Sequence, residues 1–334
     1  MKAIIPVAGI GTRLRPHTYV VPKVLLSVAG KPILGHIIDE LLTIGIQEFT
    51  FVVGYRAELV KEYIESQFKI KAEYVDQPER KGLGHAIWMT RDLHYNDPEI
   101  LIILGDTIFK ADLHAMLKKE GNQLAVKEVD DPRRFGIAVL DENKNYIVDL
   151  EEKPDKPRSN LAIVGIYLIR EPRLLYDSLT EIIEKDIKTK GEYQVTDGMR
   201  LMLEKGSKIQ PFGIEGWLDC GKPETMLTTN QELLDLHFSK KDASRYETLY
   251  PENILRSPIY IGANAKVTNS IIGPHTSIGK ESEIHNSIIE NSIIGDKAKV
   301  SDIILKDSII GDNAIVSGYK HQINIADSSE MKYQ

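Results

Sequence analysis

Apolar runs and amphipathic stretches alternate through the first hundred residues. The apolar runs predict strands at 2–8, 48–54, 71–77 and 99–106. The stretches between them place apolar residues at helical spacing and predict helices at 31–45, 56–68 and 84–93. This order is typical of a mostly parallel sheet with helices on both faces. Right-handed crossovers bring the loops at strand carboxyl ends to one edge, so loop 8–13 and Asp106 are expected there together.

The pattern changes after about Gln123. Strands with no long helix between them are predicted at 123–129, 136–141, 146–154 and 161–169, which indicates an antiparallel or mixed extension of the sheet. A helix at 192–206, a strand at 208–215 and a long helix at 222–238 follow. The polar stretch that comes next has the composition of a linker.

Aliphatic residues then recur every six positions. One aliphatic per six residues, often followed by glycine, is the hexapeptide pattern of a parallel β-helix, and an ordinary β-meander would not keep three consecutive triplets in register. About three turns are expected, each with three six-residue sides. The residues predicted to point inward are Ile261, Val267, Ile272, Ile278, Ile284, Ile288, Ile294, Val300, Ile304, Ile310 and Val316.

These patterns predict the fold class and its division into domains. The fold class is α/β, with a Rossmann-like mixed-sheet domain followed by a short left-handed parallel β-helix. The expected parts are the mixed-sheet domain at 1–238, a linker at 239–256, the β-helix at 257–318 and a polar, frayed tail at 319–334.

Composition narrows the function further. The 334 residues are 42% hydrophobic, which is ample for a packed core, and the net charge of −7 argues against binding to a nucleic acid polymer. The single cysteine, Cys220, allows no internal disulfide and suggests no cysteine-based zinc site. Because neither a signal-peptide pattern nor an apolar run of membrane-spanning length is found, a cytoplasmic protein without membrane association is expected.

The opening loop "AGIGTR", residues 8–13, follows the first strand directly. A dinucleotide fingerprint needs a third glycine where this chain has Arg13 or Leu14, and Gly30-Lys31 followed by Pro32 does not make a P-loop. Backbone N–H groups at Gly9 and Gly11, with the charge of Arg13, remain suited to an anion. A tight strand-to-helix turn explains the same glycines equally well.

Seven motifs in order carry a resemblance to a known family. They are "GTRLRP…PK…GKP" (11–32), "LGDTIF" (104–109), "RRFGIAVLD" (133–141), "DLEEKP" (149–154), "AIVGIYLI" (162–169), "GEYQVTD" (191–197) and "WLDCGKPETML" (217–227). Residues 1–235 therefore resemble the sugar-phosphate nucleotidyltransferases, also called NDP-sugar pyrophosphorylases. With the hexapeptide region, the chain is most similar to the long-form glucose-1-phosphate thymidylyltransferases.

The resemblance implies a reaction between two polyanions. A sugar 1-phosphate oxygen attacks the α-phosphorus of a nucleoside triphosphate and pyrophosphate leaves, so cations and a metal must neutralise charge. By resemblance, Asp106 and Asp219 bind Mg²⁺, although a helix N-cap at Asp106 and a turn at Asp219 are the plainer interpretations. Arg13, Lys23, Lys153 and Asp106 are the expected catalytic residues, although each lysine could simply be solvated.

The resemblance also assigns the two substrate sides. Glu152 is expected to accept hydrogen bonds from sugar hydroxyls, and core packing explains Tyr167 about as well as sugar binding does. The Gln77 amide suits a pyrimidine imide but does not separate thymine from uracil. The nucleotide-binding residues are expected to be Ala8, Gly9, Gly11, Thr12, Arg13, Gln77 and Gly82. The sugar-binding residues are expected to be Gly136, Glu152, Lys153, Gly165 and Tyr167.

Nucleotide choice remains open in the sequence. Ala8 stands where the family usually has glycine, as in bacterial UDP-glucose pyrophosphorylases, whereas "GEYQVTD" and "WLDCGKPETML" look more like the thymidylyl- and guanylyltransferase branches. Synthesis of dTDP-glucose from dTTP and glucose 1-phosphate is the first expectation, with UTP- or GTP-dependent transfer as alternatives. A non-catalytic sugar-nucleotide sensor would be expected to lose the arginine, a lysine or an aspartate, all retained here. A hexapeptide acyltransferase would need an acyl-donor site that is not found. A homo-oligomer is expected.

Overall fold

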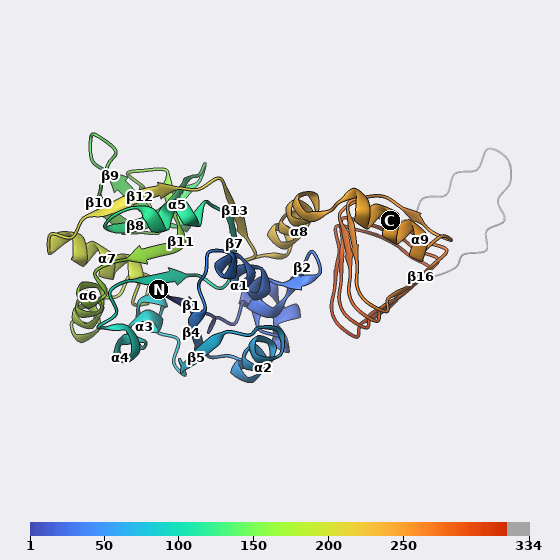
Figure 1. The fold of residues 1–334 in the computed structure, drawn as a ribbon, viewed down its shortest axis with the longest axis horizontal. Helices are drawn as coiled ribbons and strands as arrows, with labels where there is room; N and C mark the ends of the chain where they lie inside the picture. Colours follow the sequence, from blue (N-terminus) through green and yellow to red (C-terminus); the bar gives the residue numbers. More distant parts are fainter. Residues whose placement is uncertain (319–334) are drawn as a thin grey trace. The chain divides into compact units, whose positions relative to one another are not determined.

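The computed structural model describes residues 1–318, and two compact units divide them. The first unit comprises residues 1–26 and 31–226. The second comprises residues 27–30 and the described residues from Leu227 onward. Figure 1 gives the ribbon with its element labels. The frayed tail predicted at 319–334 lies outside the described residues.

A nine-stranded mixed sheet is the frame of the first unit. Its strand order is β5-β4-β1-β6-β11-β8-β12-β10-β9. The bounds are β1 Lys2–Pro6, β4 Glu48–Val53, β5 Lys71–Asp76, β6 Ile100–Ile103, β8 Asn122–Glu128, β9 Gly136–Leu140, β10 Ile147–Glu152, β11 Leu161–Ile169 and β12 Ile209–Gly213. Strands β5, β4, β1 and β6 run parallel, whereas β11 is antiparallel to both β6 and β8. The predicted parallel half and mixed extension are both confirmed.

Helices surround this sheet. The bounds are α1 Ile33–Thr43, α2 Ala57–Gln67, α3 Leu83–Trp88, α4 Arg91–His94, α5 Leu113–Lys118, α6 Pro172–Glu184 and α7 Val195–Glu204. The helix predicted at 84–93 is wrong as a single element, because α3 ends at Trp88 and α4 starts again at Arg91. Helix α6 was not predicted, although Leu175, Leu179 and Ile182 line its buried face at helical spacing.

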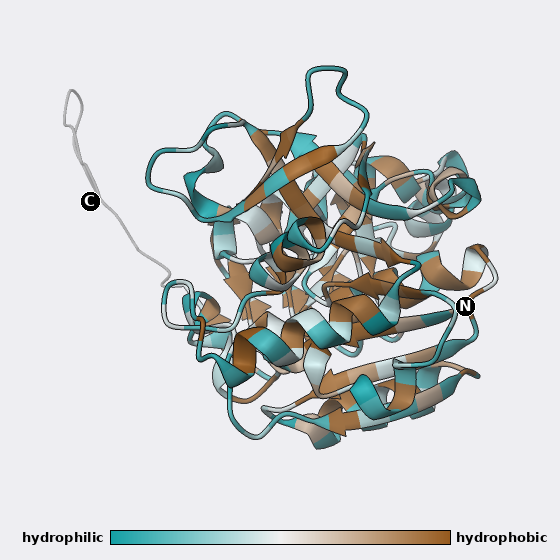
Figure 2. Cartoon of the chain, turned by 90° about the vertical axis from the view of Figure 1, so that its left-hand side faces the viewer, coloured by the Kyte–Doolittle hydropathy of each residue, from teal (hydrophilic) through white to brown (hydrophobic). Residues whose placement is uncertain are grey.

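Both faces of the central strands are buried. On one face Ile4, Val52 and Ile102 join a hydrophobic cluster with residues of α3, α6 and α7. The alternate residues Ile5 and Phe51 are also fully buried, so the opposite face is covered too. In Figure 2 the strands of this unit are largely brown, while much of the loop and helix surface is teal. This two-sided burial explains why the strands read as continuous apolar runs.

Short elements complete the first unit. Strands β7 Thr107–Lys110 and β13 Gly216–Asp219 form a separate two-stranded sheet, and β3 spans Lys31–Pro32. The 3₁₀ helices are Thr12–Leu14, His17–Tyr19, Lys23–Leu25 and Pro132–Arg134. Helix α8, Pro223–His237, spans the boundary between the two units.

The second unit is a left-handed parallel β-helix with three four-stranded faces. One face contains β14 Ile254–Leu255, β17 Ile271–Ile272, β20 Ile288–Glu290 and β23 Ile304–Lys306. The next contains β15 Ile259–Ile261, β18 Thr276–Ile278, β21 Ile293–Ile294 and β24 Ile309–Ile310. The third contains β16 Lys266–Thr268, β19 Glu283–His285, β22 Lys299–Ser301 and β25 Ile315–Ser317. Each face thus has four strands, one more than the three turns expected.

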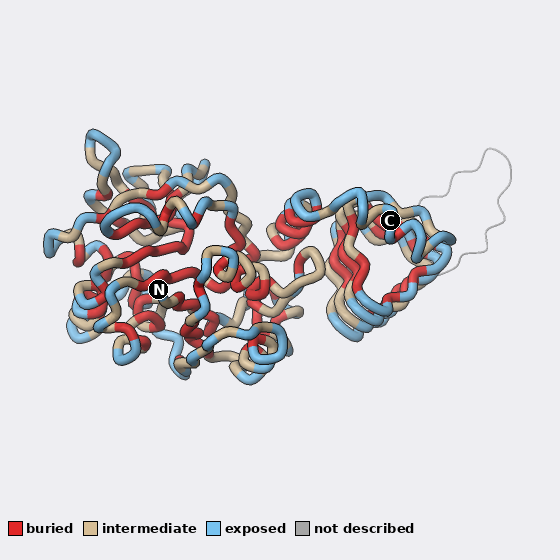
Figure 3. The backbone as a smooth tube through the Cα atoms, viewed as in Figure 1, coloured by how far each residue is buried: buried red, intermediate tan, exposed pale blue. Residues whose placement is uncertain are grey.

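The core of the β-helix corrects two predicted positions. Ile272 pairs with Ile289 and Ile289 with Leu305, so coils advance by 17 and then 16 residues rather than 18. Ile289 is therefore the buried residue, whereas the predicted core residues Ile288 and Ile304 are 38% and 73% exposed. Successive strand residues point to opposite faces, so only one of two adjacent isoleucines can enter the core. Figure 3 marks the buried positions in red.

Helix α9, Lys240–Leu249, lies within the stretch predicted as a linker. Ser239 and Asp242 form a capping box at its start. The Tyr246 hydroxyl contacts both backbone groups of Ile261, and the Tyr250 hydroxyl donates to the carbonyl of Ala265 at 3.1 Å. The helix thus hydrogen-bonds to the first coil of the β-helix.

Residues 27–30 also belong to the second unit and include β2, Ser27–Val28. The Asn230 side chain of α8 accepts from the backbone N–H of Ala29 at 2.8 Å and from the Ser277 hydroxyl at 2.6 Å. The same side chain donates to the carbonyl of His275 at 3.0 Å. Asn230 is fully buried, and these bonds satisfy both ends of its amide.

Candidate active site

The loops after the parallel strands of the first unit converge at one edge. Val7 N–H donates to the Val52 carbonyl at 2.8 Å, and Gln77 N–H donates to the Val53 carbonyl at 2.8 Å. Gly105 N–H donates to the Pro6 carbonyl at 3.3 Å. The opening loop, the residues after β4 and β5, and Asp106 therefore share the carboxyl edge, where open α/β sheets bind ligands.

Backbone conformation shapes the opening loop. Gly11 is left-handed, with φ 72°, and a Cβ there would lie 2.8 Å from the Cβ of Lys23. Its carbonyl accepts from Leu14 N–H and from the Thr18 hydroxyl, both at 2.9 Å. Only glycine fits this turn without strain. The tight-turn interpretation therefore holds at Gly11, and it leaves an anion-binding role open.

The other predicted loop residues differ in exposure. Ala8 is buried, and a Cβ on Gly54 would come within 2.9 Å of its methyl group, so the alanine packs against the neighbouring strand end. Gly9 has free space around it. Thr12 and Arg13 are exposed, and the Arg13 guanidinium makes no ion pair within residues 1–318.

Lys23 forms an ion pair with Asp106. The Lys23 Nζ lies 2.7 Å from Asp106 Oδ2, and only 9% of Lys23 is exposed. The Thr107 hydroxyl donates to the other carboxylate oxygen of Asp106 at 3.3 Å. A buried ammonium needs a partner of this kind, so Lys23 is not a freely solvated lysine.

Asp219 lies on the strand that pairs with β7. Strands β13 and β7 are antiparallel, and their register sets Asp219 opposite Thr107, next to Asp106. A Cβ on Gly221 would approach Asp219 Oδ1 within 2.9 Å, so this glycine leaves room beside the carboxylate. The strand pair thus brings together two aspartates that lie far apart in sequence.

These two carboxylates fit a magnesium ion. Mg²⁺ takes one or two protein carboxylates and completes its octahedral shell with phosphate and water. The Asp106 side chain is 42% exposed, which leaves it accessible from solvent. The described residues hold no group of three or more His, Cys, Asp or Glu that would suit a metal bound by protein ligands alone.

A second cluster contains most of the predicted sugar-side residues. Glu152, the last residue of β10, pairs in register with Gly136 of β9. Its carboxylate accepts from the Thr196 hydroxyl at 2.7 Å and contacts Lys153 Nζ at 2.9 Å. A Cβ on Gly136 would lie 3.0 Å from Glu152 Oε2. Glu152 is thereby held rigidly, while its neighbour Lys153 is 44% exposed.

Gly165 and Tyr167 occupy an irregular stretch of β11. The register with β8 shifts between Ile163 and Tyr167, and Gly165 has φ 85°. A Cβ there would clash with Leu104 at 2.6 Å. Tyr167 is buried in the core cluster, as the packing interpretation expected. Burial, together with the charges of Glu152 and Asp106, raises the pKa of Tyr167.

Gln77 lines a pocket of about 390 Å³ beside the opening loop. The other lining residues are Ile10, Gly54, Tyr55, Asp76, Pro78 and Arg80. Gly82 has φ 108°, and a Cβ there would lie 2.4 Å from the Tyr193 carbonyl oxygen, so that close approach requires glycine. The Gln77 amide nitrogen contacts the Gly82 carbonyl at 3.3 Å, which brings the two predicted base-side residues together.

Two polar residues near Glu152 were not among the predicted site residues. Thr196 holds the Glu152 carboxylate, and Asp197 keeps a buried Oδ2 without a hydrogen-bond partner in residues 1–318. Burial raises the pKa of Asp197, and the charge of Glu152 adds to the effect. Both are the last residues of the motif "GEYQVTD", and that motif could have indicated them. Buried carboxylates with raised pKa values are frequent at functional sites.

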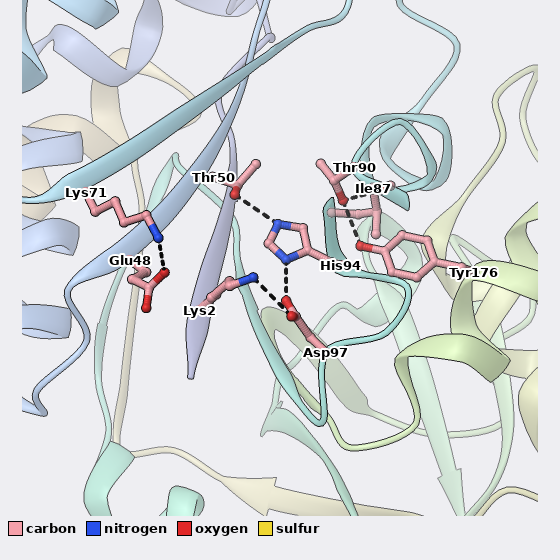
Figure 4. Close-up of polar contacts among 9 residues, drawn as sticks. All are labelled: Lys2, Glu48, Thr50, Lys71, Ile87, Thr90, His94, Asp97 and Tyr176. Carbon is pink, nitrogen blue, oxygen red and sulfur yellow. Dashed lines mark hydrogen bonds and ion pairs between the residues drawn. The ribbon is translucent and has the colours of Figure 1, made fainter. Parts of the chain in front are cut away.

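A separate polar cluster lies at the opposite edge of the sheet (Figure 4). His94 is 1% exposed, and its ring nitrogens contact Asp97 at 2.7 Å and the Thr50 hydroxyl at 2.9 Å. Lys2, the first residue of β1, forms an ion pair with Asp97 at 3.0 Å. Burial is the main cause that lowers the pKa of His94. This cluster is at the amino ends of the strands and is structural.

The carboxyl edge of the sheet thus combines a glycine loop, a lysine–aspartate pair and a second aspartate, an arrangement suited to binding a nucleoside triphosphate. The family model described as Nucleotidyl transferase matches residues 2–235. The chain therefore belongs to the nucleotidyl transferase family and is a nucleotidyltransferase. Enzymes of this family use a nucleoside triphosphate and a sugar phosphate, generally with a divalent metal ion.

Three curated relatives are similar to this chain. The bifunctional protein GlmU of Methanocaldococcus jannaschii is 40% identical over 237 residues, which cover 70% of this chain but only 55% of that protein. The UTP–glucose-1-phosphate uridylyltransferase AglF of Haloferax volcanii is 34% identical, and the match covers 70% of this chain and 96% of AglF. A glucose-1-phosphate thymidylyltransferase of Streptomyces griseus is 30% identical, and the match covers 88% of this chain and 87% of that enzyme.

A solved structure agrees with the fold of the first unit. A putative glucose-1-phosphate thymidylyltransferase from Bacillus anthracis, in complex with a sucrose, is 30% identical with a TM-score of 0.60. It covers 72% of this chain and 98% of that one. None of the helices in residues 1–318 is long and apolar enough to cross a membrane.

Proposed function

We propose that this protein transfers the thymidylyl group of dTTP to glucose 1-phosphate and releases pyrophosphate. One arrangement carries the proposal: Asp219 on β13 pairs with Thr107 of β7, directly after Asp106, and Lys23 forms an ion pair with Asp106. The thymidylyl choice is supported by a glucose-1-phosphate thymidylyltransferase whose match extends over 88% of this chain.

In the proposed reaction an oxygen of the sugar phosphate forms a bond to the α-phosphorus of dTTP. The bond from that phosphorus to the bridging oxygen breaks, and pyrophosphate leaves with the electron pair. The backbone of Ala8, Gly9, Gly11 and Thr12 approaches the triphosphate, and the exposed guanidinium of Arg13 neutralises the departing pyrophosphate. No protein nucleophile is needed, because positioning and cations supply the rate.

Asp106 and Asp219 would hold Mg²⁺, which neutralises charge on the reacting phosphates when bound. Lys23 balances the Asp106 carboxylate and keeps it in place. Lys153 lies beside Glu152, where it can bind the phosphate of the sugar. Glu152 accepts hydrogen bonds from sugar hydroxyls, since it is an acceptor held by Thr196.

The remaining assigned residues shape the two substrate sides. Gln77 and Gly82 bind the base beside the 390 Å³ pocket. Gly136 and Gly165 give the sugar room, because side chains there would meet Glu152 and Leu104. Tyr167 supports this wall from the core rather than binding sugar directly.

The test is pyrophosphate release by the purified protein with Mg²⁺. The triphosphates dTTP, UTP, GTP, ATP and CTP are each paired with the 1-phosphates of glucose, mannose and N-acetylglucosamine. The highest kcat/KM is expected for dTTP with glucose 1-phosphate. A preference for GTP contradicts the base assignment, and nucleotide binding without turnover in any pair favours a non-catalytic sensor.

UTP-dependent transfer to glucose 1-phosphate is the second candidate. The UTP–glucose-1-phosphate uridylyltransferase AglF is 34% identical to this chain over nearly all of its own length. A higher kcat/KM with UTP than with dTTP would select it and leave the proposed mechanism unchanged. The homo-oligomer stays a prediction, to be measured by analytical ultracentrifugation.

A further inference from the structure

His85, a residue with no role so far, contacts the proposed base-reading amide. The Nδ1 of His85 lies 3.1 Å from the Nε2 of Gln77. The same Nε2 lies 3.3 Å from the carbonyl oxygen of Gly82. His85 belongs to α3, whereas Gln77 directly follows β5, so the contact joins two elements at the carboxyl edge.

Hydrogen-bond chemistry fixes the orientation of this amide. The Gly82 carbonyl is only an acceptor, so the Gln77 nitrogen, and not its oxygen, must face it. At 3.1 Å from the same nitrogen, His85 Nδ1 must then offer its lone pair, which places the proton of a neutral ring on Nε2. The two acceptors use both hydrogens of the amide.

The amide oxygen is left for a ligand. Gln77 is 95% buried and lines the 390 Å³ pocket, and no residue of 1–318 donates to its Oε1. An acceptor at this position matches a ring N–H of a nucleobase. Thymine and uracil carry N3–H, whereas N3 of cytosine is itself an acceptor and would oppose the oxygen.

We propose that His85 is a positioning residue for base selection. Its unprotonated Nδ1, together with the Gly82 carbonyl, holds the Gln77 amide so that Oε1 faces the base and selects an N3–H. This inference rests on the proposed function for the location of the base. It adds that the N3–H of the base is the feature selected and that His85 is the residue that enforces this selection.

The surroundings of His85 keep the ring neutral near pH 7. Its ring stacks on Tyr193 with centroids 6.4 Å apart. The titratable groups that act on it are Glu79 and Lys81 in the preceding loop, and Tyr193 stacks on it. Glu192 precedes Tyr193 and lies beside Gly82, where a Cβ would approach the Glu192 Cβ within 2.8 Å. Burial first, and then the charge of Lys81, lowers the pKa of His85, while Glu79 opposes this.

Two substitutions separate the acceptor from the ring. His85→Asn places an amide oxygen near the position of Nδ1 and cannot be charged by acid. His85→Phe keeps a ring for stacking on Tyr193 but has no acceptor. His114→Phe, at an exposed position of α5, is the matched control for loss of an imidazole. Thermal unfolding of each variant verifies that it folds.

The measurement is the ratio of kcat/KM for dTTP over 5-methyl-dCTP, which differ only at position 4 and N3. UTP over CTP gives a second ratio. We expect His85→Phe to lower the ratio about tenfold, equivalent to about 1.4 kcal/mol, and His85→Asn and His114→Phe to keep it. In the unsubstituted protein the ratio should decrease when the pH is lowered below 6.5, because a charged ring donates from Nδ1. In His85→Asn the ratio should stay constant.

An unchanged ratio in folded His85→Phe, or a ratio in the unsubstituted protein that does not depend on pH, would overturn the inference. If no triphosphate is turned over, the proposed function fails instead. The same ratios are then taken from dissociation constants measured by calorimetry. Equal affinity of the unsubstituted protein for dTTP and 5-methyl-dCTP would in that case reject the role of His85 as well.

Discussion

The two units both use short parallel strands, but the ends of those strands differ. In the first unit each strand end is followed by a different loop, and the loops after β1 and β6 carry Gly11 and Asp106. In the β-helix the corners repeat, with left-handed residues such as Asn269, Asn286 and Asp302 in equivalent places. Loops that differ from one another can hold functional side chains, whereas corners that repeat let successive coils stack in register. Substitutions in the loops at the strand ends of the first unit should therefore affect activity, whereas substitutions in the β-helix should leave the chemistry unchanged.

The largest effect is expected from Asp106→Asn. Loss of this carboxylate removes a proposed Mg²⁺ ligand and the partner of Lys23, so pyrophosphate release should fall at least about a thousandfold. Steady-state kinetics measure this effect. The control is Glu215→Gln, which removes an exposed partner of Lys110 near the other end of the same strand pair and should retain activity. Near-normal turnover by Asp106→Asn would reject the metal assignment.

In the β-helix, substitutions at two neighbouring isoleucines should differ strongly in their effect on stability. Ile289→Asn introduces a polar group into the core of the unit and should reduce the free energy of unfolding by about 3 kcal/mol. Ile288→Asn, at a position 38% exposed, should change it by less than about 0.5 kcal/mol. Chemical denaturation followed by circular dichroism measures both. Equal losses would mean that the register described for β20 is wrong.

Left-handed positions should also differ between the two units. Gly165→Ala should destabilise the first unit by about 2 kcal/mol, because φ is 85° and the new Cβ would meet Leu104 at 2.6 Å. Asn286→Gly, at a β-helix corner with φ 50°, should change stability by only a few tenths of a kcal/mol. Thermal unfolding of both variants tests this. A similar tolerance at Gly165 would contradict the close approach to Leu104.

The smallest effect concerns pH. The pKa of His94 is lowered in the folded protein, so the unfolded chain binds its proton more readily. Stability should therefore decline as the pH falls below about 6.5, the ordinary histidine value. The melting temperature at pH 7.5 and pH 5.5 measures this. His94→Gln should reduce the difference, and an unchanged difference would exclude His94 as its cause.

Local patterns were sufficient for much of the fold. The strands that became β1, β4 and β6 are apolar because they are buried on both faces, and Gly45 ends α1 with φ 83°, as a helix stop does. The error at Ile288 has a local cause. The coil advance is 17 residues at Ile289 but 16 at Ile294, so the corner after Glu290 is one residue shorter, which hexapeptide spacing does not reveal. Its neighbour Ile289 has the same hydrophobicity, so composition could not correct the choice.

Long-range contacts in the site could not be read in this way. Lys23 and Asp106 are separated by 83 positions, and their ion pair depends on how β6 and the opening loop meet. The pairing of β7 with β13 joins residues more than a hundred positions apart, and neither strand has a distinctive pattern. The motifs indicated which residues to examine, but only the sheet order puts them together.

Helix α9 and Tyr250 bond to the first coil of the β-helix, which has an evolutionary consequence. Because Tyr246 and Tyr250 bond to the backbone of the first coil, that edge is not free to pair with another strand. A duplicated segment of 16 or 17 residues inserted between two later coils would find a partner on both sides and would leave α9 untouched. Such proteins can therefore change length by whole coils while the catalytic residues are inherited without change.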